Sequence, residues 1–342
     1  MRTLYLIEQN TILRKRGNRL LLCKRPPASR RYSAVLQKDI LLDLPCANVD
    51  HVMVFGNIQV TTSALHKMLE RGVELALFSF RGELLGQLTP PMGKNIPLRI
   101  MQFHRYQDQD FIFRFSAQIV MAKIKNALTV LRQFQKNHPE VFSSAELNVL
   151  LDFSDKIKYA SHPNALLGIE GAAAGHYFKL FGRMLKLPWV FEHRTKRPPG
   201  DPVNAVLSFG YVVCGSQLQT LLDGVGLDPY LGYFHKTAYG RPSLALDILE
   251  EFRHPLIDRL VITLFNKNIL QEGDFFWPAS GGCYLNTSGK KKFFIHYQKM
   301  LGKYSVYDID INSNGYLTIF QRQIQKLVES IREGKLYEPY YF

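Results

Sequence analysis

The hydrophobic pattern of this chain changes its period near residue 90, and that change limits the folds open to it. Up to about Leu88 the apolar residues fall in short runs typical of β-strands. Beyond about residue 100 they recur at helical spacing over long segments. Residues 89–97 are rich in proline and glycine and favour a linker. We therefore predict an α+β protein of two domains: a small β-sandwich-like domain with one helix over residues 1–89, a linker over 90–100, and a larger all-α domain over 101–342.

The N-terminal segment is predicted to contain short strands interrupted by one helix. Turn-forming pairs at Gln9–Asn10 and Gly17–Asn18 separate the first apolar runs and indicate consecutive hairpins. The helix is expected over Thr62–Glu70, because residues that can cap free amides precede it and Gly72 follows it. Further strands are predicted at residues 39–43, 52–55, 59–61, 74–78 and 84–88.

The C-terminal segment is predicted to be helical throughout. The helix expected at residues 243–267 contains Pro255, which should kink or split it. The other helices are expected at residues 108–136, 144–159, 164–187, 202–222, 290–300 and 313–333.

One acidic residue lies where the helix at residues 164–187 should be most apolar. At about 100° per residue, Glu170 falls within the stripe that contains Leu166 and Phe181, while Lys179 lies on the opposite face. A carboxylate buried without a partner costs several kcal/mol or shifts its pKa until it is neutral. A cationic or protonated group is therefore expected beside Glu170.

The candidate partners lie in and just before the helix at residues 243–267. His235 precedes this helix, and Glu250 lies at the margin of its apolar side. Two carboxylates and one imidazole are a ligand set suited to Mn²⁺ or Mg²⁺ rather than to thiolate-bound zinc. We therefore predict a metal site formed by Glu170, His235 and Glu250. The polar stripe of the same helix is predicted to contain Asp247, Glu251, His254 and Asp258.

The charge balance points to a polyanionic partner. Lys and Arg number 43 against 29 Asp and Glu, which gives a formal net charge of +14. Basic composition alone also fits a protein without such a partner. The basic residues gather at positions 14–16, 30–31, 194–197 and 290–292.

Cysteine usage and the absence of long apolar runs point to the cytoplasm. The 4 cysteines are scattered with no CxxC pair, which argues against structural zinc and a disulfide framework. The N-terminus lacks an apolar region of signal-peptide length, and no uninterrupted run of about 18 apolar residues occurs. Secretion and membrane spanning are not expected.

Four motifs occur in a consistent order along the chain. They are GIEG at 168–171, RPPGDPVNAVLSFGY at 197–211, LDPYLGYFHK at 227–236 and GRPSLALDILEEFRHPLID at 240–258. Read together, they resemble the family of CRISPR-associated endonucleases and integrases that insert new spacers into CRISPR arrays. The segment at 49–88 is similar to the first domain of that family, so the resemblance extends from about residue 4 to about residue 331.

The resemblance implies a reaction, a ligand set and partners. The family's metal ligands correspond to Glu170, His235 and Glu250, with Asp247 as a possible additional or alternative ligand. The implied reaction joins the 3′ end of a short DNA fragment to the CRISPR repeat by transesterification. The implied partners are double-stranded DNA (protospacer and repeat), a second copy that contacts the β-domain, and the small CRISPR adaptation partner protein.

Three basic residues near the predicted ligands are candidates for DNA phosphate contacts. They are Lys236, Arg241 and Arg253, and Arg253 is equally suited to pair with Glu250 or Asp258. Two other functions fit the same composition. One is a non-catalytic basic DNA-binding scaffold whose acids form structural ion pairs, and the other is hydrolysis of a small phosphoester.

Overall fold

The computed structural model describes residues 2–25, 39–90, 95–302 and 315–342. The chain is mixed α/β and divides into two compact units, one formed by residues 1–92 with 285–294 and the other by residues 93–284 with 295–342. Residues 285–294, which the sequence analysis assigned to the helical domain, therefore group with the N-terminal unit.

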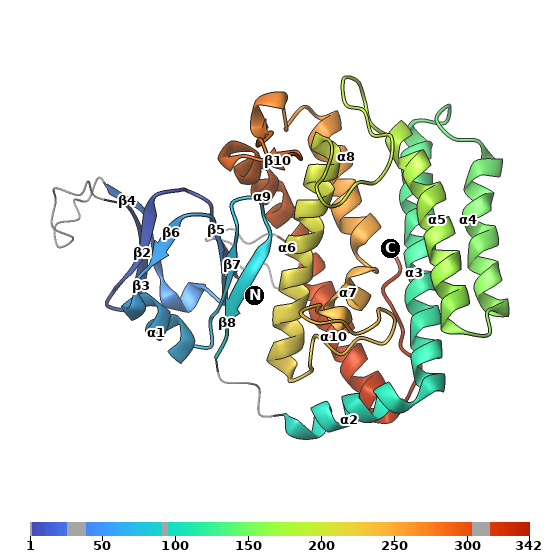
Figure 1. The fold of residues 1–342 in the computed structure, drawn as a ribbon, viewed down its shortest axis with the longest axis horizontal. Coiled ribbons are helices and arrows are strands. Elements are labelled where there is room, and N and C mark those ends of the chain that lie inside the picture. Colours follow the sequence, from blue (N-terminus) through green and yellow to red (C-terminus); the bar gives the residue numbers. More distant parts are fainter. Residues whose placement is uncertain (1, 26–38, 91–94, 303–314) are drawn as a thin grey trace. The chain divides into compact units, whose positions relative to one another are not determined.

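Among the described residues, the N-terminal unit contains two four-stranded sheets (Figure 1). In the first, β1, β5 and β7 are parallel and β8 is antiparallel to β7. In the second, β3 is antiparallel to both β2 and β4, while β6 is parallel to β2. The first sheet contains β1 (Thr3–Leu6), β5 (His51–Phe55), β7 (Glu74–Phe78) and β8 (Leu84–Leu88). The second contains β4 (Ile40–Pro45), β3 (Arg19–Lys24), β2 (Thr11–Arg16) and β6 (Ile58–Val60), and helix α1 spans Thr62–Glu70.

Only one of the two predicted N-terminal hairpins forms. Gly17 has a φ of +58° and closes the hairpin between β2 and β3. The turn at Gln9–Asn10 instead carries the chain from one sheet to the other, because β1 pairs with β5 rather than with β2. The prediction of consecutive hairpins was therefore wrong at this turn. The apolar core includes Leu13, Leu20, Val52, Val54, Met68 and Leu75.

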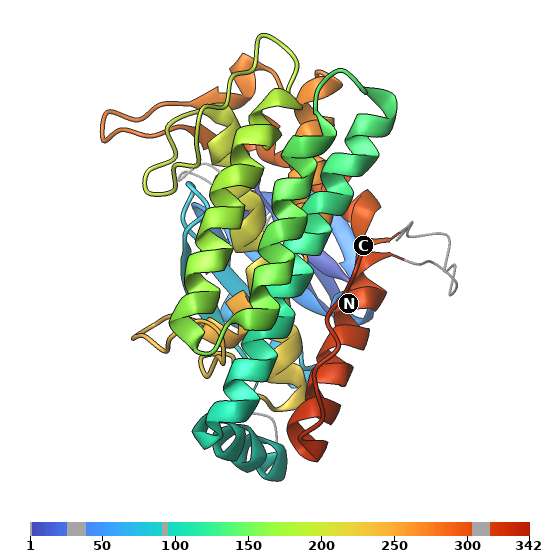
Figure 2. The same ribbon diagram turned by 90° about the vertical axis from the view of Figure 1, so that its right-hand side faces the viewer.

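The C-terminal unit is built mainly from helices. Helix α6 passes the length and composition test for a membrane span, but 78% of its most apolar window is buried inside the protein, as expected of a core helix. Helices α3, α4 and α5 lie side by side (Figures 1 and 2). The bounds are α2 (Ile96–Gln107), α3 (Gln109–Asn137), α4 (Ser144–Lys156), α5 (Pro163–Arg183), α6 (Pro202–Val225), α7 (Ser243–Leu249), α8 (Arg259–Asn266), α9 (Thr287–Leu301) and α10 (Tyr316–Glu333).

Two features depart from the predicted all-α domain and its linker. The strands β9 (Phe275–Phe276) and β10 (Tyr284–Leu285) pair as a short ribbon. Helix α2 forms where part of the linker was predicted. Pro97 lies in the first turn of α2, where its missing N–H costs nothing, so proline there is compatible with a helix start.

The predicted helix over residues 243–267 is broken, and the break begins earlier than Pro255. Helix α7 ends at Leu249 with Glu250 as its C-cap, and a π-helical turn over Arg253–Asp258 precedes α8. Pro255 has no N–H to donate, and its ring would clash with the carbonyl of Glu251 in a continuous helix. The widened turn accommodates this restriction and leaves Glu250 at the end of α7.

Candidate metal centre

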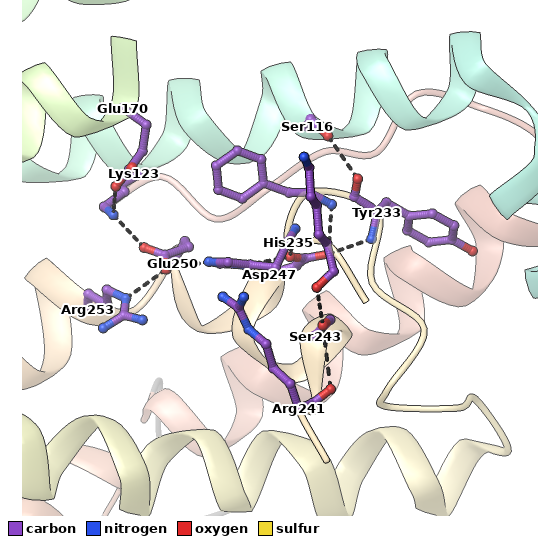
Figure 3. Close-up of polar contacts among 12 residues, drawn as sticks. Ser116, Lys123, Glu170, Tyr233, His235, Arg241, Ser243, Asp247, Glu250 and Arg253 are labelled. Carbon is purple, nitrogen blue, oxygen red and sulfur yellow. Dashed lines mark hydrogen bonds and ion pairs between the residues drawn. The ribbon is translucent and has the colours of Figure 1, made fainter. Parts of the chain in front are cut away.

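The three predicted ligands come from separate elements, and Glu250 lies near both of the others: Lys123 links it to Glu170, and His235 faces it directly (Figure 3). Glu170 lies on α5, Glu250 follows α7, and His235 lies in the loop before α7. The Lys123 ammonium contacts the Glu170 carboxylate, and its Nζ lies 2.7 Å from Oε2 of Glu250. Nε2 of His235 lies 3.7 Å from Oε1 of Glu250. The structure therefore joins Glu170 and Glu250 through one buried cation and places His235 beside Glu250.

Glu250 is held as a buried carboxylate by positive charge. Its side chain is 3% exposed, and Nε of Arg253 lies 2.9 Å from its Oε1. Burial alone raises the pKa of Glu250, but Arg253, Lys123 and His235 outweigh that effect and leave the pKa well below its usual range. Oε2 lies within ion-pair distance of Lys123 but accepts no hydrogen bond of good geometry from the described residues.

Asp247 is engaged with the backbone and ring of the His235 loop. Its Oδ2 accepts hydrogen bonds from the amides of Tyr233 and Phe234 at 2.7 and 3.0 Å. Its Oδ1 accepts from the amide and from Nδ1 of His235 at 2.8 and 2.7 Å. Both oxygens are thus committed to protein donors, and an imidazole that donates from Nδ1 presents the Nε2 lone pair toward Glu250. This geometry favours Asp247 as the residue that orients His235, with Glu250 as the acid facing the site.

The loop that carries His235 fits closely against α7. A β-carbon on Gly232 would lie 2.7 Å from Ser243 and 2.9 Å from Oδ2 of Asp247, distances that a real side chain does not adopt. The Ser243 hydroxyl donates to the carbonyl of Lys236 at 3.1 Å. Close approach at Gly232 therefore allows Asp247 to reach the amides that follow it.

Lys123 is the site residue that the sequence analysis missed. It lies on α3 between the buried residues Ile119 and Ala127, one turn before and after it. Burial lowers the pKa of Lys123, but Glu250 and Glu170 outweigh that effect and raise the pKa, so the side chain is an ammonium. A charge on an apolar helical stripe was the signal that identified Glu170. Lys123 is likewise a charged residue on the apolar face of α3.

The predicted polar stripe of the 243–267 segment does not face solvent. Asp247, Glu251, His254 and Asp258 are all at most 2% exposed. Asp258 accepts hydrogen bonds from the hydroxyls of Tyr211 and Tyr177 at 2.5 and 2.9 Å and pairs with Nδ1 of His254 at 2.7 Å. Other helices cover this segment and supply polar partners to its charges.

The three candidate DNA-contact residues differ in their surroundings. Arg253 pairs with Glu250, and its guanidinium lies 4.4 Å from the ring centroid of Tyr211, so of the two partners considered it takes Glu250. Figure 3 shows the side chain of Arg241 directed toward the site, and it forms no ion pair with a carboxylate of the described residues. Lys236 is exposed. Arg241 and Lys236 therefore remain available to an anion.

The predicted basic clusters also contain both residues with partners in the protein and residues exposed to solvent. Arg194 donates hydrogen bonds to Asn204 and Ser208 at 2.7 and 2.8 Å, and Arg16 pairs with Asp43 at 2.9 Å. Lys290 is buried, whereas Lys291 is exposed. The cluster at positions 30–31 lies outside the described residues.

The donor set fits Mn²⁺ or Mg²⁺, although the side chains do not form a closed coordination sphere. Within the described residues, no three His, Cys, Asp or Glu side chains are close enough together to hold a metal ion. The Lys123 ammonium occupies the space between Glu170 and Glu250. The carboxylates of Glu250 and Glu170 and the oriented imidazole are ligands that these ions accept. The donor types therefore match such an ion, whose binding would require Lys123 to move from between the two acids.

Comparison with known proteins gives consistent matches. Residues 4–299 match the family described as CRISPR associated protein Cas1. The chain is 32% identical over 338 residues to CRISPR-associated endonuclease Cas1 3 of Thermus thermophilus, covering 98% of this chain and 96% of that relative. It is 36% identical over 259 residues to a CRISPR-associated exonuclease Cas4/endonuclease Cas1 fusion of Geobacter sulfurreducens, covering 73% of this chain and 46% of the fusion. The chain thus spans about half the length of that fusion protein.

A solved structure shares the fold. A casposase bound to its integration product superposes with a TM-score of 0.83 at 21% identity, over 98% of this chain and 92% of the casposase. Sequence identity at this level supports the fold alone, whereas the match over residues 4–299 and the Thermus relative establish the family. This chain belongs to the Cas1 family of CRISPR-associated proteins.

Proposed function

We propose that this protein is a metal-dependent DNA endonuclease and integrase that inserts spacer DNA into a CRISPR array by 3′-hydroxyl transesterification. The observation that carries the proposal is that Lys123 links the carboxylates of Glu170 and Glu250, with His235 beside Glu250, in a strongly basic protein. Family membership supports the same assignment.

The site residues have distinct roles in this proposal. Glu170, Glu250 and Nε2 of His235 would hold the divalent cation, and Asp247 keeps the imidazole in the required tautomer and orientation. Bound Mn²⁺ or Mg²⁺ supplies Lewis-acid stabilisation of the phosphoryl group and the leaving oxyanion. Arg241 and Lys236 bind phosphates of the DNA and align the 3′-hydroxyl with the scissile phosphate.

The strand-transfer step conserves phosphodiester bonds. A bond forms between the 3′ oxygen of the incoming strand and the phosphorus of the repeat, and the bond from that phosphorus to the repeat's own 3′ oxygen breaks. The incoming hydroxyl loses its proton and the departing 3′ oxygen gains one. No nucleotide energy source is required by this balance, so the residues need only position the groups and stabilise charge.

Partners and location complete the proposal. We expect residues 1–89 to mediate homodimerisation and residues 101–342 to contain the catalytic site, in a cytoplasmic assembly with the small CRISPR adaptation partner protein. Double-stranded DNA, as protospacer and repeat, is the polyanion to which the formal charge of +14 is suited.

One alternative is favoured by a specific observation. Lys123 and Arg253 already neutralise Glu250 without a metal, as expected for a DNA-binding scaffold with structural ion pairs. Strand transfer from a 3′-hydroxyl duplex into a repeat-containing plasmid, measured with Mn²⁺ and after chelation, separates the two functions. We expect Glu170→Ala and His235→Ala to abolish strand transfer while DNA binding largely survives. Metal-independent binding with no strand transfer by the wild type would support the scaffold instead.

A further inference from the structure

The ammonium of Lys123 occupies the position that a shared metal ion requires. It contacts Glu170 on one side and lies 2.7 Å from Oε2 of Glu250 on the other. These are the two carboxylates that would coordinate a divalent cation through oxygens at about 2.0–2.2 Å from the ion. An ammonium and a divalent ion cannot contact the same pair of oxygens together, because the two cations would collide and repel each other.

The second cation beside Glu250 is held differently. Arg253 is three residues from Glu250, and its guanidinium lies on the Tyr211 ring at 4.4 Å. It contacts Oε1 of Glu250 alone, whereas Lys123 contacts both Glu170 and Glu250. Lys123 is therefore the cation that a metal ion shared by these two acids must displace.

The Lys123 and Glu170 side of the cluster is less buried than the Glu250 side. The side chains of Lys123 and Glu170 are 11% and 20% exposed, whereas that of Glu250 is 3% exposed. The shortest route by which the ammonium can reach solvent therefore runs along the Lys123 and Glu170 side. A lysine on a four-carbon stem can rotate along that route while α3 itself does not move.

We propose that Lys123 is an exchangeable internal counter-ion of the catalytic centre. It holds Glu170 and Glu250 together when no divalent cation is bound, and it leaves when one binds. The released ammonium then lies beside the site, where it binds a DNA phosphate. This inference rests on the proposed function and adds a residue that no sequence motif includes.

The exchange couples metal binding to DNA binding. A lysine released from two carboxylates adds one phosphate contact, so a divalent cation should tighten DNA binding, and DNA should tighten cation binding by the same factor. Each additional phosphate contact also makes the DNA affinity fall more steeply as the salt concentration rises.

The most direct test uses the wild-type protein, Mn²⁺ alone and an amine-acylating reagent. Mass spectrometry of the labelled peptides should show that acylation of Lys123 rises several-fold when Mn²⁺ is added. Lys125, which is exposed on the same helix, should be labelled equally in both states and serves as the internal control. Continued protection of Lys123 at saturating Mn²⁺ would overturn the proposal.

A variant tests the competition itself. Lys123→Met should bind Mn²⁺ roughly tenfold or more tightly than the wild type in a DNA-free titration, because a competing charge has been removed. Lys125→Met loses the same charge and should bind Mn²⁺ as the wild type does. Unchanged or weaker Mn²⁺ binding by folded Lys123→Met would contradict the exchange. If that variant does not fold, labelling of the wild type decides the question.

DNA binding tests the second half of the inference. In the wild type, Mn²⁺ should tighten duplex binding and increase the magnitude of the salt slope by about one. In Lys123→Met the salt slope of DNA binding should not change when Mn²⁺ is added. Equal changes of this slope in the wild type and the variant would contradict the proposed phosphate contact. The labelling and Mn²⁺ titrations involve no strand transfer, so they can succeed even if the integrase assignment fails.

Discussion

Glu250 and Glu251 are adjacent and equally buried, yet their carboxylates lie in opposite kinds of surroundings. Glu250 faces the cations Lys123 and Arg253. Glu251 accepts hydrogen bonds from the neutral hydroxyl of Tyr337 and the amide of Tyr340, each at 2.6 Å. The C-terminal residues that supply these donors lie beside α3, where Asn126 donates to the carbonyls of both Glu251 and Tyr340 at 2.9 Å (Figure 1).

The two environments move the pKa values in opposite directions. Burial raises the pKa of Glu251 to about 7, because neutral donors offset only part of the cost of its charge. The cations beside Glu250 outweigh burial and hold its pKa well below the usual range. A carboxylate kept charged by movable cations can exchange one of them for a metal ion, whereas one fixed by neutral donors anchors the chain. The difference distinguishes the acid proposed to bind the metal ion from a structural one.

The largest expected effect is on strand transfer. Glu250→Gln should lower its rate by about three orders of magnitude or more, because the ion loses a charged ligand. Glu251→Gln should stay within about fivefold of the wild type, since glutamine can accept from Tyr340 and donate to Tyr337. Plasmid strand-transfer rates compare the two variants, and similar losses in both would erase the distinction.

Stabilisation of the fold by Mn²⁺ should also distinguish Glu250→Gln from Glu251→Gln. At an Mn²⁺ concentration about 100 times the dissociation constant, the wild type and Glu251→Gln should each gain about 2.7 kcal/mol in unfolding free energy. Glu250→Gln should gain much less. Thermal unfolding with Mn²⁺ and after chelation measures this, and equal stabilisation of Glu250→Gln would show that the ion binds elsewhere.

Asp247→Asn tests the orientation of His235. We expect Mn²⁺ affinity to fall by about 10- to 100-fold. In the wild type, Oδ1 of Asp247 accepts hydrogen bonds from both the backbone amide and Nδ1 of His235. The neutral side chain of asparagine would no longer hold the imidazole in this orientation. Asp223→Asn, at a half-buried aspartate whose neighbours do not include the site, is the control. Titration with Mn²⁺ compares the two, and an unchanged affinity for Asp247→Asn would show that His235 needs no such support.

The smallest expected effect is on the unfolding free energy, when one hydrogen bond to the Glu251 carboxylate is removed. Tyr337→Phe removes one donor to a buried carboxylate and should lower the unfolding free energy by about 1–2 kcal/mol. Tyr341→Phe, at a half-exposed ring, should change the unfolding free energy by less than about 0.5 kcal/mol. Urea unfolding measures both, and strand transfer should change little in either variant.

Helix positions could be predicted from the sequence where the residues at the helix ends indicate a start and a stop. The helix predicted at Thr62–Glu70 forms as α1, although its N-cap residue Thr61 makes no side-chain capping hydrogen bond. Asp201 accepts from the amide of Asn204 at 2.8 Å and caps α6. The sheet pairing was less predictable, because the turn at Gln9–Asn10 forms a hairpin or a crossover depending on which distant strand pairs with β1.

Within the site, the acids were easier to predict than the cations. Glu170 was recognisable as a charge on an apolar face, and Lys123 carries the same signal on a helix 47 residues earlier. Periodicity shows that two such charges are buried but not that they meet, because the meeting depends on how α3 packs against α5. The break after Leu249 was likewise hidden, since Pro255 signals a disruption whose extent is set by tertiary packing.

Anomalous scattering from crystals grown with Mn²⁺ tests the central claim most directly. We predict one peak bonded to carboxylate oxygens of Glu170 and Glu250 and to Nε2 of His235, at about 2.0–2.3 Å from each, with the Lys123 ammonium displaced from between the two acids. A peak bound elsewhere, or no peak at a Mn²⁺ concentration that supports strand transfer, would contradict the account.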